Sequence, residues 1–450
     1  MQVTDARNMN AAEIAALMKK KAFDEVELSP RIQAGTDAMF GRHMTAAMVV
    51  DQIVADVKAE GDAKLFYYTQ LIDRAELNPN NIRVTEEEFA EAEAIVKPEV
   101  KAALRRAIAN VMRFHEEQMP KTWLTNRPYG SMLGQKITPV DSVGIYVPGG
   151  TAAYPSSVMM NACPAKVAGV PRIVMAVPPG KDGKVNANVL VTAKLIGVTE
   201  IYKMGGAQAI AALAYGTETV PKVEKITGPG NIFVTLAKKA VIGHVDIDML
   251  AGPSEILVIA DDTAEPEYLA ADLLSQAEHD PLACAILVTD SERVAKAVAE
   301  EIEVQLARLP RKEIAETSLA QAGKIILAKD LETVIEMANL SAPEHLEIMT
   351  KEPFAVMPYI RNAGAIFLGK YSPEPLGDYY AGPNHVLPTG GTAKFYSVLN
   401  VETFMKKTSI IAYTAEALFG AAEDVITLAE AEGLRAHANA IRERLKKEGK

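Results

Sequence analysis

The 450-residue sequence has only two cysteines, Cys163 and Cys284, which lie far apart and form no CxxC pattern. A disulfide framework is therefore not expected, and a zinc site would have to use histidine, carboxylate or amide ligands. The chain also lacks an uncharged apolar run long enough to span a bilayer, and its opening stretch MQVTDARNMNAAEIAALMKK lacks the apolar core of a signal peptide. These absences predict a cytoplasmic protein with reduced thiols.

Basic residues are in the minority. The sequence has 47 lysines and arginines against 58 aspartates and glutamates, which gives a formal net charge of −11 at pH 7. Nucleic acids and anionic membranes need a basic surface, so neither is expected as a partner. A metal cation or a small cationic substrate suits this acidic field better than a polyanion does.

Segments of strand length alternate with helical segments from Ile137 onwards, beginning with ITPVDSVGIYVPGG, SSVMMNACPAKVAGV and RIVMAVPPG. This alternation predicts βαβ units and a parallel sheet, with ligands at the carboxyl ends of its strands. Small residues follow several of these strands, where they let backbone N–H groups approach a phosphate: Gly149–Gly150, Gly205–Gly206, Gly228–Gly230 and Gly252. The GPGNIF stretch has Phe233 in place of the third glycine of a dinucleotide motif, so its position after a strand is the better argument.

The segments before and after this stretch show different hydrophobic patterns. Apolar residues recur at helical spacing in the first 130 residues. A second α/β stretch begins with a helix predicted over residues 267–280, includes another helix over 331–339, and has a strand near Ile366. After about Asn400 the sequence predicts helices, the last of them charged and amphipathic.

Two junctions concentrate polar side chains. In LLSQAEHDPLACAILV, Gln276 and His279 are three residues apart at the end of a predicted helix, so both can reach one metal ion. The alternative is a polar helix end, where His279 is favourable to the helix dipole. In NLSAPEHLEIM, Ser341 and Glu344 fit a capping box, which predicts a helix start. The same segment places Glu344, an acid, beside His345, a base that titrates near neutrality.

Two further segments carry candidate groups. GDYYAGPNHVLPTGG, residues 377–391, is rich in turn residues and contains Asp378 and His385. Long irregular stretches in compact enzymes are often functional, although His385 could equally be a hydrogen-bonding loop histidine. In AEAEGLRAHANA, Glu432 and His437 taken alone are typical of a solvated helix face.

These segments together resemble the histidinol dehydrogenase family. The similarity runs over most of the chain and rests on SQAEHDP, SAPEHLE, GDYYAGPNHVLPTGG, IDMLAGPSE, VGIYVPGG and TGPGN. The resemblance implies an oxidoreductase of histidine biosynthesis that oxidises L-histidinol to L-histidine through L-histidinaldehyde. It also implies two NAD+ per reaction, a bound zinc ion and a homodimer.

The resemblance assigns roles to particular residues. The expected zinc ligands are Gln276, His279, Asp378 and, donated by the partner subunit, His437. The expected proton-transfer residues are Glu344 and His345. The expected substrate contacts are the four zinc ligands, His345, Ser254 and, again from the partner subunit, Glu432. The expected NAD+ contacts are Tyr146, Gln208 and Asn231.

The implied fold is α/β, with two Rossmann-like parallel-sheet domains, one inserted in the other, and small helical terminal segments. The larger domain, with the metal and catalytic residues, is expected from residues 26–145 and 251–398, and the inserted NAD-binding domain from residues 146–250. The helical terminal segments are expected at residues 1–25 and at 399–450, the latter reaching the partner subunit.

Three alternatives stay open at this point. The first is a dehydrogenase of the same scaffold that acts on another small alcohol, such as a sulfonated diol. The second is a zinc hydrolase, in which metal-bound water attacks an acyl or amide carbon. The third is a non-catalytic protein of metabolic ancestry, against which the intact acid–base pair and metal candidates count.

Overall fold

The computed structural model describes residues 1–20, 28–149 and 154–449. Its contacts divide into two compact units, the first formed by Met1–Gln118 with Val140–Phe404 and the second by Met119–Pro139 with Met405–Lys450. Gly150, one of the glycines after the first predicted βαβ strand, lies outside the described residues. Across the described ranges, no helix has the length and apolar character that a membrane span requires.

The first unit contains a six-stranded parallel sheet with the order β1-β11-β10-β9-β12-β13. Its strands are Val3–Asp5 (β1), Glu255–Ala260 (β9), Cys284–Thr289 (β10), Lys324–Leu327 (β11), His345–Met349 (β12) and Ala365–Leu368 (β13). The central strands are nearly continuous apolar runs, such as EILVIA and CAILVT, because helices cover both of their faces.

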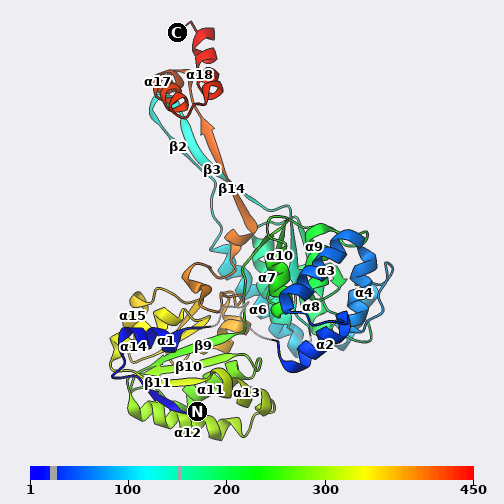
Figure 1. Cartoon of the computed structure of the whole chain (residues 1–450), viewed down its shortest axis with the longest axis vertical. Coiled ribbons are helices and arrows are strands. Elements are labelled where there is room, and N and C mark those ends of the chain that lie inside the picture. Colours follow the sequence, from blue (N-terminus) through cyan, green and yellow to red (C-terminus); the bar gives the residue numbers. More distant parts are fainter. Residues whose placement is uncertain (21–27, 150–153, 450) are drawn as a thin grey trace. The chain divides into compact units, whose positions relative to one another are not determined.

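Two groups of helices cover this sheet (Figure 1). One face carries α11 (Pro266–Ala277), α12 (Glu292–Leu306) and α13 (Lys312–Ala322), and the other carries α1 (Ala11–Met18) and α14 (Leu331–Ser341). Successive residues of β9 alternate between the two cores: Ile256 packs with the first group, and Leu257 with the second. The short helices α15 (Pro353–Val356) and α16 (Glu374–Leu376) follow β12 and β13.

A second, five-stranded parallel sheet has the order β6-β5-β4-β7-β8. Its strands are Ser142–Tyr146 (β4), Arg172–Val177 (β5), Glu200–Lys203 (β6), Lys225–Thr227 (β7) and Asp246–Ile247 (β8). The intervening helices are α7 (Pro155–Val167), α8 (Ala187–Ile196), α9 (Gly206–Tyr215) and α10 (Ile232–Ala240). The winding direction reverses between β4 and β7, which creates the switch point where parallel sheets bind ligands. The α/β class with two parallel sheets is thus confirmed.

Between α1 and the five-stranded sheet, the described residues form the helices α2 (Pro30–Phe40), α3 (Ala46–Glu60), α4 (Asp62–Asp73), α5 (Glu86–Ile95) and α6 (Pro98–Glu116). Helices α3 and α4 pack against α9, α5 packs against α8, and α6 packs against α7. The apolar stripe of α3, including Val50, Ile53 and Val57, joins the core beneath the five-stranded sheet. The resemblance assigns residues 26–145 to the larger domain, and these domain boundaries stay a prediction.

The second unit is built on an antiparallel sheet with the order β14-β3-β2 (Figure 1). Its strands are Trp123–Asn126 (β2), Met132–Pro139 (β3) and Met405–Ala412 (β14), and its helices are α17 (Ala415–Ala431) and α18 (Arg435–Lys447). The prediction of helix throughout from about Asn400 is therefore wrong for β14, which pairs along its full length with β3. The prediction of a purely helical N-terminus is also wrong, since β1 adds an edge strand beside β11.

Candidate active site

Several predicted site residues lie at the amino edge of the six-stranded sheet. Ser254, which is half-buried, directly precedes β9, His279 lies between α11 and β10, and Glu344 and His345 stand at the start of β12. Parallel strands begin at a common edge, so segments distant in sequence meet there. These residues therefore lie at the amino ends of the strands of the six-stranded sheet. The glycines, in contrast, predict a ligand site at the carboxyl ends of the strands of the five-stranded sheet.

The predicted helix start at Ser341 is wrong. Helix α14 ends at Ser341, Ala342 adopts a left-handed conformation with φ 44°, and β12 begins at His345. The capping-box pattern does not form because the apolar residues after Glu344 complete a buried strand between β9 and β13. Glu344 thus ends a short connection, and the neighbouring strand fixes its side chain.

The backbone of Glu255 on β9 positions both members of the acid–base pair. Its N–H donates to Glu344 Oε2 at 2.7 Å, and its carbonyl lies 2.9 Å from His345 Nδ1. A carbonyl only accepts, so Nδ1 carries a proton, and Nε2 is the basic nitrogen of the neutral ring. This Nε2 is buried and has no hydrogen-bond partner in residues 1–20, 28–149 and 154–449; it lies 3.8 Å from Asp378 Oδ1.

The two side chains of the pair perturb each other. Burial raises the pKa of the Glu344 carboxyl to about 7. Burial would lower the pKa of His345, but the charges of Glu344 and Asp378 outweigh it and raise that pKa to about 10. Glu344 Oε2 lies 3.6 Å from His345 Nδ1, so the two groups titrate as a coupled unit.

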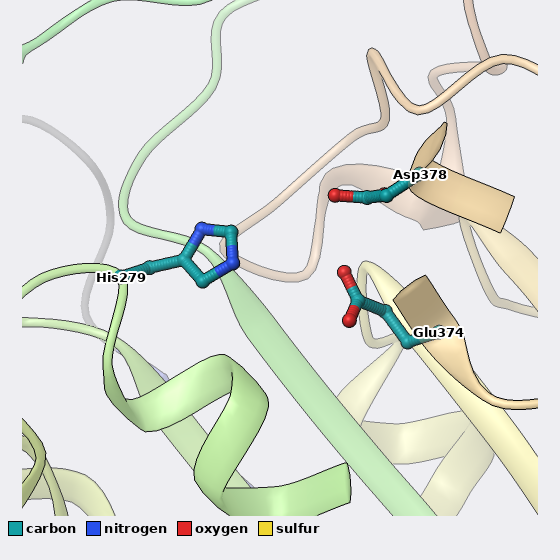
Figure 2. Close-up of side chains that lie close together, drawn as sticks. All are labelled: His279, Glu374 and Asp378. Atoms are coloured by element: carbon teal, nitrogen blue, oxygen red, sulfur yellow. The ribbon is translucent and has the colours of Figure 1, made fainter. Parts of the chain in front are cut away.

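His279, Glu374 and Asp378 form a group able to hold a cation. One ligand atom from each lies within 4.8 Å of the others. Figure 2 shows the His279 ring and the two carboxylates turned toward a common space. They come from the segment after α11, from α16 and from the π-helical turn Gly377–Ala381. Two of the predicted zinc ligands, His279 and Asp378, are thus brought together, with ligand types that zinc accepts.

Gln276 and Glu374 add to this group in different ways. Gln276 is fully buried on α11, and within the described part of the chain neither polar atom of its side chain has a hydrogen-bond partner. A buried amide left without partners is costly, which fits a side chain that awaits a ligand. Glu374 was not predicted from the sequence, where its signal is a glutamate between Pro373 and Pro375, four residues before Asp378.

A cavity of about 310 Å³ adjoins the group, and its lining includes His345, Phe367, Asp378, His385 and Leu387. His385 Nδ1 lies 3.6 Å from Asp378 Oδ1 and has no hydrogen-bond partner. Burial would raise the pKa of Asp378, but the imidazoles of His385 and His345 hold it well below its usual range. His385 therefore lies in the candidate site, and its role there stays a prediction.

Hydrogen bonds to segments near both parallel sheets hold the loop that carries Asp378 and His385. Asn384 Nδ2 donates to the Met160 carbonyl on α7 at 2.6 Å, and Asn110 Nδ2 on α6 donates to the Tyr380 carbonyl at 2.9 Å. On the other side, Gly252 N–H donates to Thr389 Oγ1. The irregular stretch is thus ordered by hydrogen bonds to helices that cover the five-stranded sheet, and it links the two sheets.

The predicted NAD+ contacts lie at the carboxyl ends of the five-stranded sheet. Tyr146 ends β4, and its hydroxyl accepts from Gly206 N–H at 3.1 Å. Gly228, after β7, has φ 118°, and a Cβ there would lie 2.1 Å from the Tyr146 carbonyl oxygen. Only glycine permits this approach, which brings the TGPGN segment against the end of β4 at the switch point.

The other two predicted NAD+ contacts begin helices. Gln208 is fully buried in the first turn of α9, where its Nε2 donates to Asp73 Oδ2 at 3.3 Å and its Oε1 has no partner. Asn231 is the N-cap of α10, and its side chain accepts from Phe233 N–H and Val234 N–H. Helix N-termini at the edge of a sheet suit the phosphates of a dinucleotide.

Glu432 and His437 belong to the second unit. Glu432 follows α17, and His437 lies in the first turn of α18, where its N–H donates to the Leu434 carbonyl. Their predicted donation to the site of a partner subunit stays a prediction.

Glu374 of the candidate cation group also belongs to a cluster of buried acids with Asp272 and Glu347. Asp272 and Glu347 are hydrogen-bonded to each other, and Glu374 N–H donates to Glu347 Oε1 at 2.8 Å. Burial raises the pKa of Asp272 to about 6 and that of Glu374 to about 8, and it raises that of Glu347 well above its usual value. The site therefore stands in strongly acidic surroundings, which favour a cation.

Comparisons with known proteins point to one family. The family model for histidinol dehydrogenase matches residues 41–445. A histidinol dehydrogenase of Heliobacterium mobile is 60% identical over 398 residues, which cover 88% of this chain and 93% of that protein. A histidinol dehydrogenase of Bacillus subtilis is 54% identical over 421 residues, which cover 94% and 96% respectively. The crystal structure of histidinol dehydrogenase from Elizabethkingia anophelis superimposes with a TM-score of 0.90 at 38% identity and covers 100% of this chain and 99% of that one.

The acid cluster leads to a prediction about stability and pH. A carboxyl whose pKa is raised in the folded state stays protonated after its unfolded counterpart has ionised, so the free energy of unfolding falls as pH rises from about 4.3 toward the folded pKa. Because glutamine does not titrate, Glu347→Gln should make this fall shallower by up to about 1.4 kcal/mol per pH unit. Urea unfolding of chelator-treated protein between about pH 5 and pH 7 measures the slope. Glu332→Gln, an exposed change on α14, is the control; equal slopes for Glu347→Gln and wild type would contradict the prediction.

Proposed function

The chain belongs to the histidinol dehydrogenase family, an oxidoreductase family of histidine biosynthesis, and on that premise we propose that it converts L-histidinol to L-histidine with two NAD+ and a bound zinc ion. The observation that carries the proposal is the position of His345. Its unpartnered Nε2 lies at a cavity beside the convergent side chains of His279, Glu374 and Asp378. A base beside a cation-binding group is what oxidation of a polar alcohol requires.

The donor set supports zinc. Gln276, His279 and Asp378 supply an amide oxygen, an imidazole and a carboxylate, and His437 of the partner subunit would complete the set. The buried amide of Gln276 has no other partner. Burial lowers the pKa of His279, which keeps its ring in the neutral form that binds metals. When bound, the ion would orient the imidazole and amine of the substrate and neutralise Asp378, which lowers the pKa of the neighbouring His345.

The first oxidation needs a base for the alcohol proton. The Glu255 carbonyl fixes the Nδ1–H tautomer of His345, so Nε2 accepts the hydroxyl proton while the carbon-bound hydride leaves to NAD+. Glu344 lies on the Nδ1 side of the ring at 3.6 Å, where its carboxylate stabilises the imidazolium that forms. The products of this half-reaction are L-histidinaldehyde, NADH and one proton.

The second oxidation needs water on the aldehyde carbon. Glu344, with a pKa of about 7, is suited to take a proton from that water and release it near neutrality. His345 then removes a hydroxyl proton of the hydrate as the second hydride leaves to another NAD+. The carboxylic acid of L-histidine and a second NADH result, which completes the four-electron change.

The proposed partners and cofactor site follow the same assignment. Ser254, directly before β9, and Glu432 of the partner subunit would contact the substrate. Tyr146, Gln208 and Asn231, at the carboxyl ends of the five-stranded sheet, would contact NAD+. The loop 377–391, hydrogen-bonded to α6 and α7, would keep the two half-sites in register. A homodimer follows from the residues that the second unit donates.

The stoichiometry tests the whole proposal. Purified protein should contain zinc and produce about two NADH per L-histidinol consumed, because two hydrides leave each substrate molecule. Absorbance of NADH combined with chromatography of L-histidine measures the ratio. A ratio of about one would indicate that the aldehyde is the end product, and product formation without NAD+ would indicate a hydrolase. A sulfonated diol preferred over L-histidinol would change the substrate and leave the chemistry intact.

Removal of the base should slow both oxidations. His345→Asn keeps an amide N–H for the Glu255 carbonyl but has no counterpart of Nε2, so kcat should fall by about 10²–10⁴. Zinc content and the urea midpoint should stay near the wild-type values, because the ring contacts no proposed zinc ligand within hydrogen-bond distance. Steady-state kinetics and metal analysis check both expectations. A kcat within about twofold of wild type would remove His345 from the proton chemistry.

The shared site can be tested by mixing variants. Asp378→Ala and His437→Ala subunits should each be inactive, whereas their mixed dimers contain one intact site. A random equal mixture should regain about a quarter of the wild-type activity, because half of the dimers are mixed and each has one good site of two. Asp378→Ala mixed with His279→Ala is the matched control, since both lie in the same unit of the chain and no intact site can form. Equal activity of the two mixtures would show that His437 acts within its own subunit, and an active His437→Ala protein on its own would show that His437 plays no part.

A further inference from the structure

A second cavity lies on the α1 side of the six-stranded sheet. It has a volume of about 470 Å³ and lies between α1, the end of α14 and the loop that follows Thr389. Its apolar wall includes Ala15, Ala16, Met18 and Leu340. Its polar wall is formed by Lys19, Lys20, Lys394, Ser341, Gly390 and Gly391.

The polar wall is positively charged in a protein of net charge −11. Three lysines, Lys19, Lys20 and Lys394, contribute to the lining, and among the described residues no acidic side chain does. Two of these lysines come from the end of α1 and the third from the segment after Gly391, so the chain brings them together from opposite ends. Cations gathered on an otherwise acidic molecule attract an anion.

Ser341 gives independent evidence that the cavity takes a ligand. The residue is 1% exposed, and its buried hydroxyl oxygen has no hydrogen-bond partner among the residues that the structure describes. A buried hydroxyl that makes no hydrogen bond is destabilising, and such groups need a reason in a native structure. It lines the same wall as Gly391, where an added Cβ would lie 3.7 Å from the Ser341 carbonyl oxygen. A ligand oxygen in the cavity would satisfy this hydroxyl once the Ser341 side chain rotates toward it.

We propose that this cavity binds a small organic molecule through an oxyanion, a carboxylate or a phosphate group. The lysines supply the charge, Ser341 Oγ–H donates to the oxyanion, and the apolar wall of α1 and Leu340 covers the rest of the molecule. The site is distinct from the proposed NAD+ contacts, because Tyr146, Gln208 and Asn231 do not line it.

A chain of contacts links this site to the acid–base pair. Lys20 Nζ lies 2.5 Å from Glu255 Oε2, and Gly390 N–H donates to Glu255 Oε1 at 3.0 Å. The backbone of the same Glu255 holds Glu344 and His345. An anion that draws Lys20 away from Glu255 therefore acts on the residue that positions the pair. This coupling rests on the proposed function, whereas binding of the anion does not.

The test uses the full-length zinc-loaded protein at constant ionic strength. Titration calorimetry with glycerol 3-phosphate and, separately, with succinate should detect binding of at least one probe. Ser341→Ala should weaken that binding about tenfold, because a hydrogen bond to a charged group is lost, and Lys394→Ala should weaken it several-fold. Lys351→Ala removes an exposed lysine of the same unit that does not line the cavity, and it should change nothing. Ser341→Ala should not lower the urea midpoint, since the hydroxyl it removes has no partner.

Each outcome decides a part of the proposal. Binding of the phosphate ester alone or of succinate alone identifies the source of the oxyanion. Failure of both probes to bind, or equal weakening by Lys351→Ala, overturns the site. Turnover of L-histidinol should change several-fold at saturating probe in the wild type and much less in Ser341→Ala; binding without any such change overturns the coupling. Calorimetry measures anion binding even if the protein does not turn over L-histidinol. Failure of the anion site can therefore be distinguished from failure of the proposed function.

Discussion

The hydrogen bonds between the Glu255 backbone and the Glu344–His345 pair are the contacts on which the rest of the site depends. They exist because β9 and β12 are neighbouring parallel strands with Ile256 opposite His345. A strand is a rigid support, so the tautomer of His345 is set by the fold of the sheet and not by a mobile loop. The Glu255 side chain meanwhile lies between Lys20 and Gly390, so one residue joins the pair to the second cavity.

Buried negative charge is the second constraint. Asp272, Glu347, Glu374 and Asp378 are contributed by α11, β12, α16 and the turn that follows α16, and all four side chains are largely buried. Ionised carboxylates at such density are stable only with protons or a cation among them. The pKa values of Asp272, Glu347 and Glu374 are raised, whereas the pKa of Asp378 is lowered. Asp378 is therefore the most readily ionised member of the cluster and the one best suited to bind a metal ion.

The sequence predicts the fold class and most of the site because the evidence is local. Alternating apolar runs give the two parallel sheets, and short motifs give His279, Asp378, Glu344 and His345. Where prediction fails, a tertiary contact overrides a local pattern. Ser341 and Glu344 fit a capping box, but pairing of β12 with β9 and β13 makes the segment a strand. Similarly, MKKTSIIA becomes β14 only because β3 offers an edge. Glu374 was missed because its local signal, a glutamate between two prolines, does not say that the short helix α16 places its side chain beside His279.

In the proposed reaction the two parallel sheets have different roles, and they use opposite ends of their strands. At the carboxyl ends of the five-stranded sheet, helix N-termini and Gly228 allow close approach of a dinucleotide. At the amino ends of the six-stranded sheet, the starts of β9, β10 and β12 gather acids and imidazoles instead. A proton acceptor and an electron acceptor must meet at one carbon, so the two edges have to be held against each other. The irregular loop that carries Asp378 is hydrogen-bonded through Asn384 to α7 and through Asn110 to α6, and it also bonds to Gly252 and Glu255 beside β9. A segment that belongs to neither sheet is free to make contacts in both directions.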